Sequence, residues 1–233
     1  MMSLMLAMVM LAGDVAQDVP ERPREAWVFR SILDQRPRVV TVALHEDLWI
    51  AYDATNCGLY RAWHGDVRLD GAVYTTVHGP QPRSRGRTYA NGLDGDIWHV
   101  RGEDGAAPAS VRWLGYAISG GQVHLRYELT LDGGARVKIT ERPEYRTDDD
   151  GQPILERLFS VEGLPAGATL ELRIDYSFAT GSGGGHVSVD GPARFFPVPS
   201  RIGDDAPPQG TLRITENGRA TLNMHFHPQE NAR

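Results

Sequence analysis

The sequence predicts an all-β protein, an antiparallel two-sheet β-sandwich of the jelly-roll or supersandwich-like kind, with about twelve to fifteen strands. Apolar and polar residues alternate along most of the chain, which is the period of a half-buried strand. Glycine-containing pairs typical of tight hairpin turns separate these runs. No stretch carries apolar residues at the spacing of an amphipathic helix. With 233 residues, including 26 Gly and 15 Pro, the chain can bury a substantial core in one domain.

The chain begins with an apolar run, MMSLMLAMVMLA. It is too short to cross a bilayer and resembles the hydrophobic region of a secretory signal. Residues 14–25 are polar, contain two prolines and are typical of a linker. We therefore expect a signal peptide and linker over residues 1–25, a single β-sandwich domain over 26–233, an extracytoplasmic location (periplasmic or secreted) and no membrane span. The lone Cys57 is compatible with either side of a membrane.

Three later runs give the clearest strand patterns. Residues 123–129, 168–178 and 220–226 each place their apolar side chains on one face and polar side chains on the other. We expect each run to be a half-buried strand.

Turn residues mark the connections between the predicted strands. Ser119-Gly120-Gly121, Asp132-Gly133-Gly134 and Asn217-Gly218 are hairpin signals, so we expect consecutive strands to pair antiparallel. Residues 79–92 and 190–210 are rich in Pro and Gly and are predicted to be long loops. The glycine run at 181–185 has no following Lys-Ser or Lys-Thr, which favours a hairpin over a phosphate-binding loop.

The formal charge of −6 argues against a general nucleic-acid or anionic-membrane binder, because either would need a basic surface. A neutral or cationic small ligand is compatible with this charge. No motif indicates a bound cofactor, and we expect none.

Residues 26–82 hold three of the five tryptophans and the only cysteine. Strand alternation puts Trp49 and Asp53 on one face and Tyr52 on the other, so aromatic rings fall on both faces. Aromatic rings beside Asp, Arg and His are typical of sugar sites; the alternative is that these rings fill the core. The candidate ligand-binding residues are Trp49, Asp53, Tyr60, Trp63, His64, Asp70, Tyr74, His78 and Arg83. Arg83 belongs to a three-arginine cluster that could clamp a carboxylate or a sugar acid, although a solvated loop is the ordinary explanation.

The histidines and aspartates suggest metal or acid/base chemistry, but their spacing matches no zinc or EF-hand pattern. We therefore expect no dedicated metal site. His225-Phe226-His227 puts two imidazoles on one side of a strand, as cupin-type sites do. The remaining cupin spacing is absent, so we interpret the pair as exposed histidines at a strand end. Cys57 has no surrounding catalytic signature and is expected to be buried.

Three phrases carry a resemblance to a known family: WVFRSILDQRPRVVTVALHEDLWIAYD, CGLYRAWHGDVRLDGAVYTTVHGPQP and GQVHLRYELTLDGGARVKITERPEY. They resemble a β-rich N-terminal domain of bacterial extracytoplasmic proteins that continue into a c-type haem domain, some of which also carry a sugar-dehydrogenase-like propeller. The resemblance covers roughly residues 26–178 and implies an exported module associated with redox or carbohydrate metabolism. The chain has no C-x-x-C-H motif, so any haem would belong to a partner domain.

These observations favour an exported, non-catalytic β-sandwich module that binds a carbohydrate-like ligand or a haem-containing or propeller partner domain. Two alternatives stay open. One is a sugar-active enzyme that uses a His/Asp acid–base pair, with an arginine of the 83–87 cluster. The other is a structural spacer domain. A cleft that brings a histidine and a carboxylate together would favour the enzyme, and an aromatic platform would favour the binder.

Overall fold

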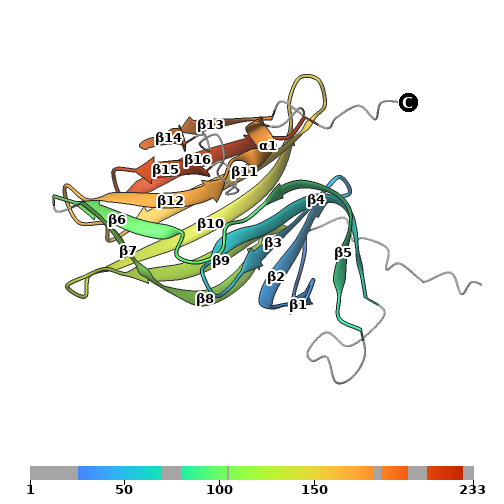
Figure 1. The fold of residues 1–233 in the computed structure, drawn as a ribbon, viewed down its shortest axis with the longest axis horizontal. Coiled ribbons are helices and arrows are strands. Elements are labelled where there is room, and N and C mark those ends of the chain that lie inside the picture. The colour runs from blue at the N-terminus through green and yellow to red at the C-terminus, as the bar shows by residue number, and fades with distance from the viewer. Residues whose placement is uncertain (1–25, 70–79, 104, 181–184, 199–208, 228–233) are drawn as a thin grey trace, which may run out of the picture.

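The computed structural model describes residues 26–69, 80–103, 105–180, 185–198 and 209–227. Within these residues sixteen strands form three antiparallel sheets, and α1 (Ser177–Thr180) is a single helical turn (Figure 1). This confirms the predicted all-β, antiparallel class. The predicted signal peptide and linker lie outside the described residues. No helix in the described ranges is long and apolar enough to span a membrane.

Sheet A is a five-stranded meander in chain order. Its strands are β1 (Trp27–Leu33), β2 (Arg36–His45), β3 (Leu48–Asp53), β4 (Gly58–Arg68) and β5 (Arg83–Asn91). Asp34 and Gln35, both with positive φ, form the two-residue turn between β1 and β2.

Sheets B and C contain the remaining strands, and both mix early and late segments of the chain. Sheet C has the order β13 (His186–Asp190), β16 (Gly218–His225), β11 (Pro153–Glu162), β10 (Arg136–Thr147), β9 (Gln122–Thr130), β8 (Ser110–Ser119). Sheet B has the order β14 (Ala193–Val198), β15 (Gln209–Ile214), β12 (Thr169–Asp175), β6 (Trp98–Gly102), β7 (Gly105–Pro108).

The inner face of sheet C packs against both other sheets, and apolar side chains of all three sheets form one core. Tyr127 of β9 lies 5.5 Å from Trp98 of β6 in sheet B, measured between ring centroids. Its neighbour Glu141 of β10 accepts a hydrogen bond from Tyr52 of β3 in sheet A. The sandwich therefore has sheet C as one layer and sheets A and B side by side as the other, where the sequence suggested two sheets.

A buried ion pair lies in the middle of this core. Arg157 of β11 donates two hydrogen bonds to the Glu141 carboxylate, at 2.6 and 3.2 Å, and both side chains are fully buried. Tyr52 and Tyr127 donate their hydroxyl protons to the same carboxylate. Burial alone would lower the pKa of Arg157, but Glu141 and the two tyrosines raise it, so the guanidinium stays charged.

Two of the three predicted strand patterns are confirmed in full. The apolar residues of 123–129 and 220–226 face the core and are buried. The third strand, predicted over 168–178, ends at Asp175, because the Asp175 carboxylate accepts a hydrogen bond from the Ser177 backbone N–H and turns the chain into α1.

Two predicted hairpins are confirmed and one prediction is wrong. β8–β9 and β9–β10 pair across their glycine turns as expected. Asn217-Gly218, however, connects β15 in sheet B to β16 in sheet C, and these strands do not pair. The Asn217 side chain instead holds the backbone of Leu164 through two hydrogen bonds of 2.8 and 2.9 Å. These contacts with a distant residue outweigh the local preference of the Asn-Gly pair for a hairpin turn.

The two predicted long loops each contain a strand. β5 occupies most of residues 79–92, and β14 occupies part of residues 190–210. Both strands pair with a neighbouring strand along most of their length. The high Pro and Gly content of these segments therefore wrongly indicated loops. Residues 181–184 of the predicted glycine hairpin lie outside the described residues.

Candidate functional site

The β4–β5 ribbon folds back over the outer face of sheet A, as Figure 1 shows at the end of the molecule that carries β5. Gly65 and Gly86 pair at the bend, with φ of 133° and 111°. Beyond it, Ser84 reaches the β1–β2 turn, where its backbone N–H and hydroxyl both donate to the Asp34 carboxylate at 2.9 and 2.6 Å. The Asp34 backbone N–H donates to the Pro82 carbonyl at 3.0 Å. These bonds close the ribbon over the sheet.

A second apolar cluster fills the space under this ribbon. Trp49 and Trp63 are its largest members, with ring centroids 6.0 Å apart and nearly parallel planes. Trp63 has no exposed surface, and its indole N–H donates to the Asp66 carbonyl at 3.0 Å. Aromatic residues do lie on both faces of sheet A, as predicted, and the outer face is covered by the chain itself.

The alternation of faces along β4 is broken at one point. Strict alternation would place Tyr60 on the face opposite Trp63, yet both pack in the second cluster. The register between β3 and β4 shifts between Ala51 and Tyr52, so Tyr60 is the extra residue of a β-bulge.

Of the predicted site residues that the structure describes, Trp49, Tyr60 and Trp63 meet in the second cluster, while Asp53, His64 and Arg83 are not part of it. Trp49, Trp63 and Asp53 are buried, Tyr60 is half-buried, and His64 and Arg83 are exposed. Asp70, Tyr74 and His78 lie outside the described residues. Arg83, Arg85 and Arg87 lie on β5 rather than on a loop, at alternate positions that share one face.

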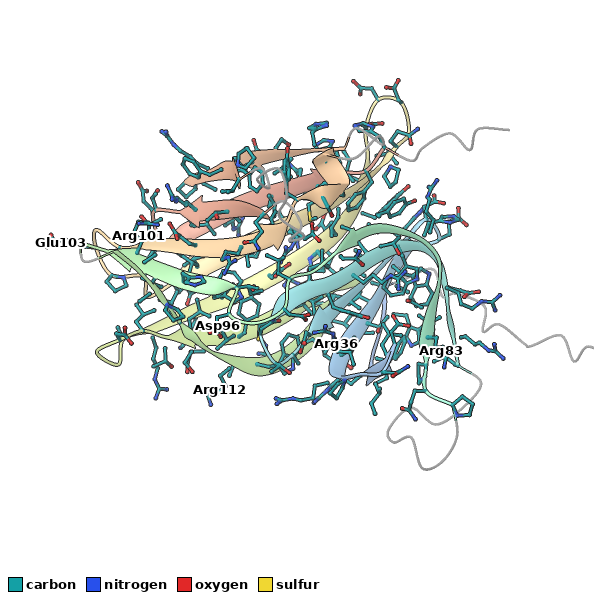
Figure 2. All side chains as sticks on the ribbon, viewed as in Figure 1. Arg36, Arg83, Asp96, Arg101, Glu103 and Arg112 are labelled. Atoms are coloured by element: carbon teal, nitrogen blue, oxygen red, sulfur yellow. The ribbon has the colours of Figure 1, made fainter. Side chains whose placement is uncertain are left out.

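A polar groove of about 280 Å³ opens where the β3–β4 turn meets the start of β8. Of the predicted site residues that the structure describes, one lines the groove, Asp53. Figure 2 shows Arg36 and Asp96 near the middle of the molecule, with Arg83 toward one end and Glu103 at the other. The polar side chains that line the groove are Arg36, Asp53, Thr55, Asn56, Asp96 and Ser110.

Arg36 forms the charged side of the groove. Its guanidinium donates to Asp53 at 2.9 Å and to Asp94 at 2.6 Å, and it lies 4.7 Å from the Tyr60 ring centroid. Burial alone would lower the pKa of Arg36, but the two carboxylates more than offset this and raise it. The guanidinium is therefore charged and held on three sides.

The turn that presents Asp53 is fixed by its own side chains. Asp53 accepts from the Thr55 N–H at 2.7 Å, and Asn56 accepts from the Gly58 N–H at 3.0 Å. The Asn56 amide donates to the carbonyls of Leu93 and Gly95. These bonds hold the segment that precedes Asp96 against the β3–β4 turn. The groove is therefore preformed.

Backbone strain accompanies this turn. Cys57 has a φ of 54° and Arg38, in the neighbouring strand, has a φ of 59°. Non-glycine residues with positive φ are uncommon and often occur at functional sites. The Ala54 N–H donates to the Arg38 carbonyl at 3.0 Å. This backbone hydrogen bond links Arg38 to the turn that contains Cys57.

Asp96 is the free acceptor of the groove: in the described part of the chain it makes no hydrogen bond or ion pair. A carboxylate, an amide, a guanidinium and a hydroxyl around one concavity suit a ligand with several hydroxyl groups. Among the residues that the structure describes, no histidine lines the groove. Burial, together with the Glu141 and Asp53 charges, raises the pKa of nearby Cys57 to about 12, which leaves it a neutral thiol rather than a nucleophile.

A separate group of polar and titratable side chains surrounds Asp47 in the β2–β3 turn. Its carboxylate oxygens lie 3.4 Å from His45 Nδ1 and 3.5 Å from His64 Nε2, and it accepts from the Tyr145 hydroxyl at 3.4 Å. The side chains of His45, Asp47 and His64 are 39–48% exposed. This arrangement has the His/carboxylate proximity of an acid–base pair, but solvent reaches every member, so it lacks the shielding that strengthens catalytic electrostatics. His45, Glu46 and Asp47 are also close enough to bind an exposed cation.

Three lining residues, Arg36, Asn56 and Asp96, are absent from the predicted ligand-binding set. Asn56 had a local signal, since Asp53-Ala-Thr-Asn56 contains two residues that favour side-chain-stabilised turns. Arg36 and Asp96 are 17 residues before and 43 residues after Asp53, so only the fold brings them to the groove.

No protein-family model matches the chain, and no curated protein matches it.

Proposed function

We propose that this protein is a non-catalytic β-sandwich module that binds a carbohydrate-like ligand in the groove lined by Arg36, Asp53, Asn56 and Asp96. The single observation that carries the proposal is the preformed set of polar groups around one concavity, in which Asp96 has no partner among the described residues. Sugars are recognised by such fixed hydrogen-bonding groups.

The volume of the groove limits the size of the ligand. About 280 Å³ is just below the range of typical small-molecule sites, which span roughly 300–1,000 Å³. We expect one sugar ring, or the terminal ring of a longer chain, to occupy it. A neutral or cationic sugar is favoured over an anionic one, because Arg36 already has two carboxylate partners while Asp96 has none.

Binding is tested by calorimetric titration of the purified chain with neutral, amino and acidic mono- and disaccharides. Asp96→Ala removes the free acceptor without touching the Arg36 ion pairs, and we expect about a 10- to 100-fold weaker affinity, as for loss of a hydrogen bond to a charged group. Glu103→Ala is the matched control, since Glu103 is an exposed acid at the far end of the molecule. No binding of any sugar, or equal affinity for parent and Asp96→Ala, would overturn the proposal.

The proposal includes an extracytoplasmic location beside a haem-containing or propeller partner domain. It rests on the apolar N-terminal run and on the resemblance described above. Expression of the full chain in a bacterium, followed by fractionation and N-terminal sequencing, tests the location. Retention of residues 1–12 on a cytoplasmic product would contradict it.

A further inference from the structure

Three histidines meet at the outer edge of sheet C. His186 of β13 pairs directly with His225 of β16 across the strand ladder. His227 follows two residues after His225, and its ring centroid lies 5.6 Å from that of His186. The sequence showed the His225/His227 pair, but only the pairing of β13 with β16 adds a third imidazole from 39 residues earlier.

The distance between two of these side chains fits a shared metal ion. His227 Nε2 lies 3.4 Å from His186 Nδ1. Two nitrogens bound to one tetrahedral ion at 2.0–2.1 Å each are about 3.3–3.4 Å apart. The pair is therefore spaced for a common ion.

His225 supplies a third donor. Its Nε2 lies 3.2 Å from the Ser188 hydroxyl, and its Nδ1 is buried with no hydrogen-bond partner among the described residues. Metal-binding histidines commonly use one ring nitrogen for the ion and hold the other in a hydrogen bond. The His225 and His186 rings are stacked, with centroids 3.9 Å apart and planes 14° apart. Stacked rings have parallel in-plane lone pairs, so the His225 ring must rotate to reach an ion held between His186 and His227.

We propose that His186, His225 and His227 form a binding site for a divalent transition-metal ion that prefers nitrogen ligands, with Zn²⁺ as the reference ion. Three imidazoles plus a water complete a tetrahedral shell. Ca²⁺ and Mg²⁺ are excluded as preferred ions because they require oxygen ligands. The site is separate from the polar groove and does not depend on the proposed sugar binding.

Such an ion would fasten the edge of sheet C. β13 is a short edge strand that pairs with β16 alone among the described strands of its sheet. The three ligands lie on β13, on β16 and just after the end of β16. An ion that binds only the folded chain stabilises it in proportion to RT ln(1 + [L]/Kd). Zn²⁺ at 100 times its Kd should thus raise the free energy of unfolding by about 2.7 kcal/mol.

The experiment uses the full chain after removal of metal with EDTA. Zn²⁺ is titrated by calorimetry, and Co²⁺ is added as a spectroscopic probe, since tetrahedral Co²⁺ has strong visible absorption bands. We expect one ion per chain, and at least a tenfold loss of affinity in His186→Gln and in His227→Gln. Circular dichroism of each variant verifies the fold; His186 is cross-checked with His186→Asn if the Gln variant unfolds.

Two matched controls separate this site from other histidines. His124→Gln removes a histidine on the outer face of sheet C, and His45→Gln disrupts the competing cluster around Asp47. Both should bind Zn²⁺ as the parent does. The proposal is overturned if the parent does not bind Zn²⁺ at about 1 mM, the weak end of the Kd range known for extracellular calcium modules. It is also overturned if His45→Gln abolishes binding while His186→Gln does not.

Discussion

Gly65 and Gly86 lie opposite each other in the β4–β5 ribbon. At each glycine, a carbonyl oxygen of the other strand occupies the space that a Cβ would need. A Cβ on Gly65 would collide with the Arg85 carbonyl oxygen, and one on Gly86 with the His64 carbonyl oxygen. The close approach lets the ribbon bend sharply and cover the outer face of sheet A. Two aromatic side chains that a flat sheet would expose, Trp49 and Trp63, are buried as a result.

The glycine bend is the first feature to test. Gly65→Ala should lower the free energy of unfolding by 1–3 kcal/mol or more, on the order expected for strained backbone, because it combines a positive φ with a backbone collision. Gly102→Ala is the control, since a Cβ there meets no atom within 4 Å and no positive φ is involved. Urea unfolding of both variants measures the difference. Equal stabilities would show that the bend does not require glycine.

The second apolar cluster predicts a large effect of Trp63→Ala. Removal of a fully buried indole should cost about 3–5 kcal/mol through lost burial and a cavity. Tyr116→Ala removes an aromatic ring that is 37% exposed, and we expect a change within about 0.5 kcal/mol. Thermal and urea unfolding report both. A Trp63→Ala protein as stable as the parent would mean that the ribbon does not cover this cluster in solution.

Glu141 and Arg157 give the third prediction. Glu141→Gln leaves the Arg157 guanidinium buried without its counter-charge and should destabilise the protein by about 3–5 kcal/mol. The double variant Glu141→Gln/Arg157→Met removes both charges but keeps an amide oxygen to accept from the Tyr52 and Tyr127 hydroxyls, so it should recover a large part of that loss. Chemical unfolding of the two variants measures the free energy of unfolding of each. If the double variant is no more stable than Glu141→Gln, the loss comes from packing rather than from an unpaired charge.

Alkaline pH should destabilise the protein. Burial, reinforced by the charge of Glu141, raises the pKa of Tyr52 and Tyr127 well above 10, and raises that of Cys57 to about 12. Above about pH 9 the unfolded chain therefore releases protons that the folded chain keeps, so the free energy of unfolding falls as pH rises. Urea unfolding at pH 8 and pH 10.5 measures the fall.

Cys57→Ala separates the contribution of the thiol to this pH dependence. The variant lacks the Cys57 titration, so its stability should fall less steeply between pH 9 and pH 12 than that of the parent. A thiol reagent at pH 8 should also leave the native parent unmodified and label it only after unfolding. Rapid labelling of the folded protein would contradict the burial of Cys57.

Local sequence determined the strand class and most turns. Alternation over 123–129 and 220–226 identified buried faces, because the two-residue period of a strand depends only on backbone geometry. The glycine turns after β8 and β9 followed from φ values that few other residues adopt. Where a bulge interrupted the period, as at Tyr60, the pattern assigned the wrong face.

Only the tertiary structure decided which strands share a sheet and which polar groups meet. Asn217-Gly218 has the composition of a hairpin, yet contacts with Leu164 carry the chain between sheets. Arg36 and Asp96 reach Asp53, and His186 reaches His225, through pairings between distant segments. Such pairings depend on the summed packing of whole sheets rather than on any local run, and for that reason the sequence indicated the fold class while the groove and the histidine cluster emerged only in three dimensions.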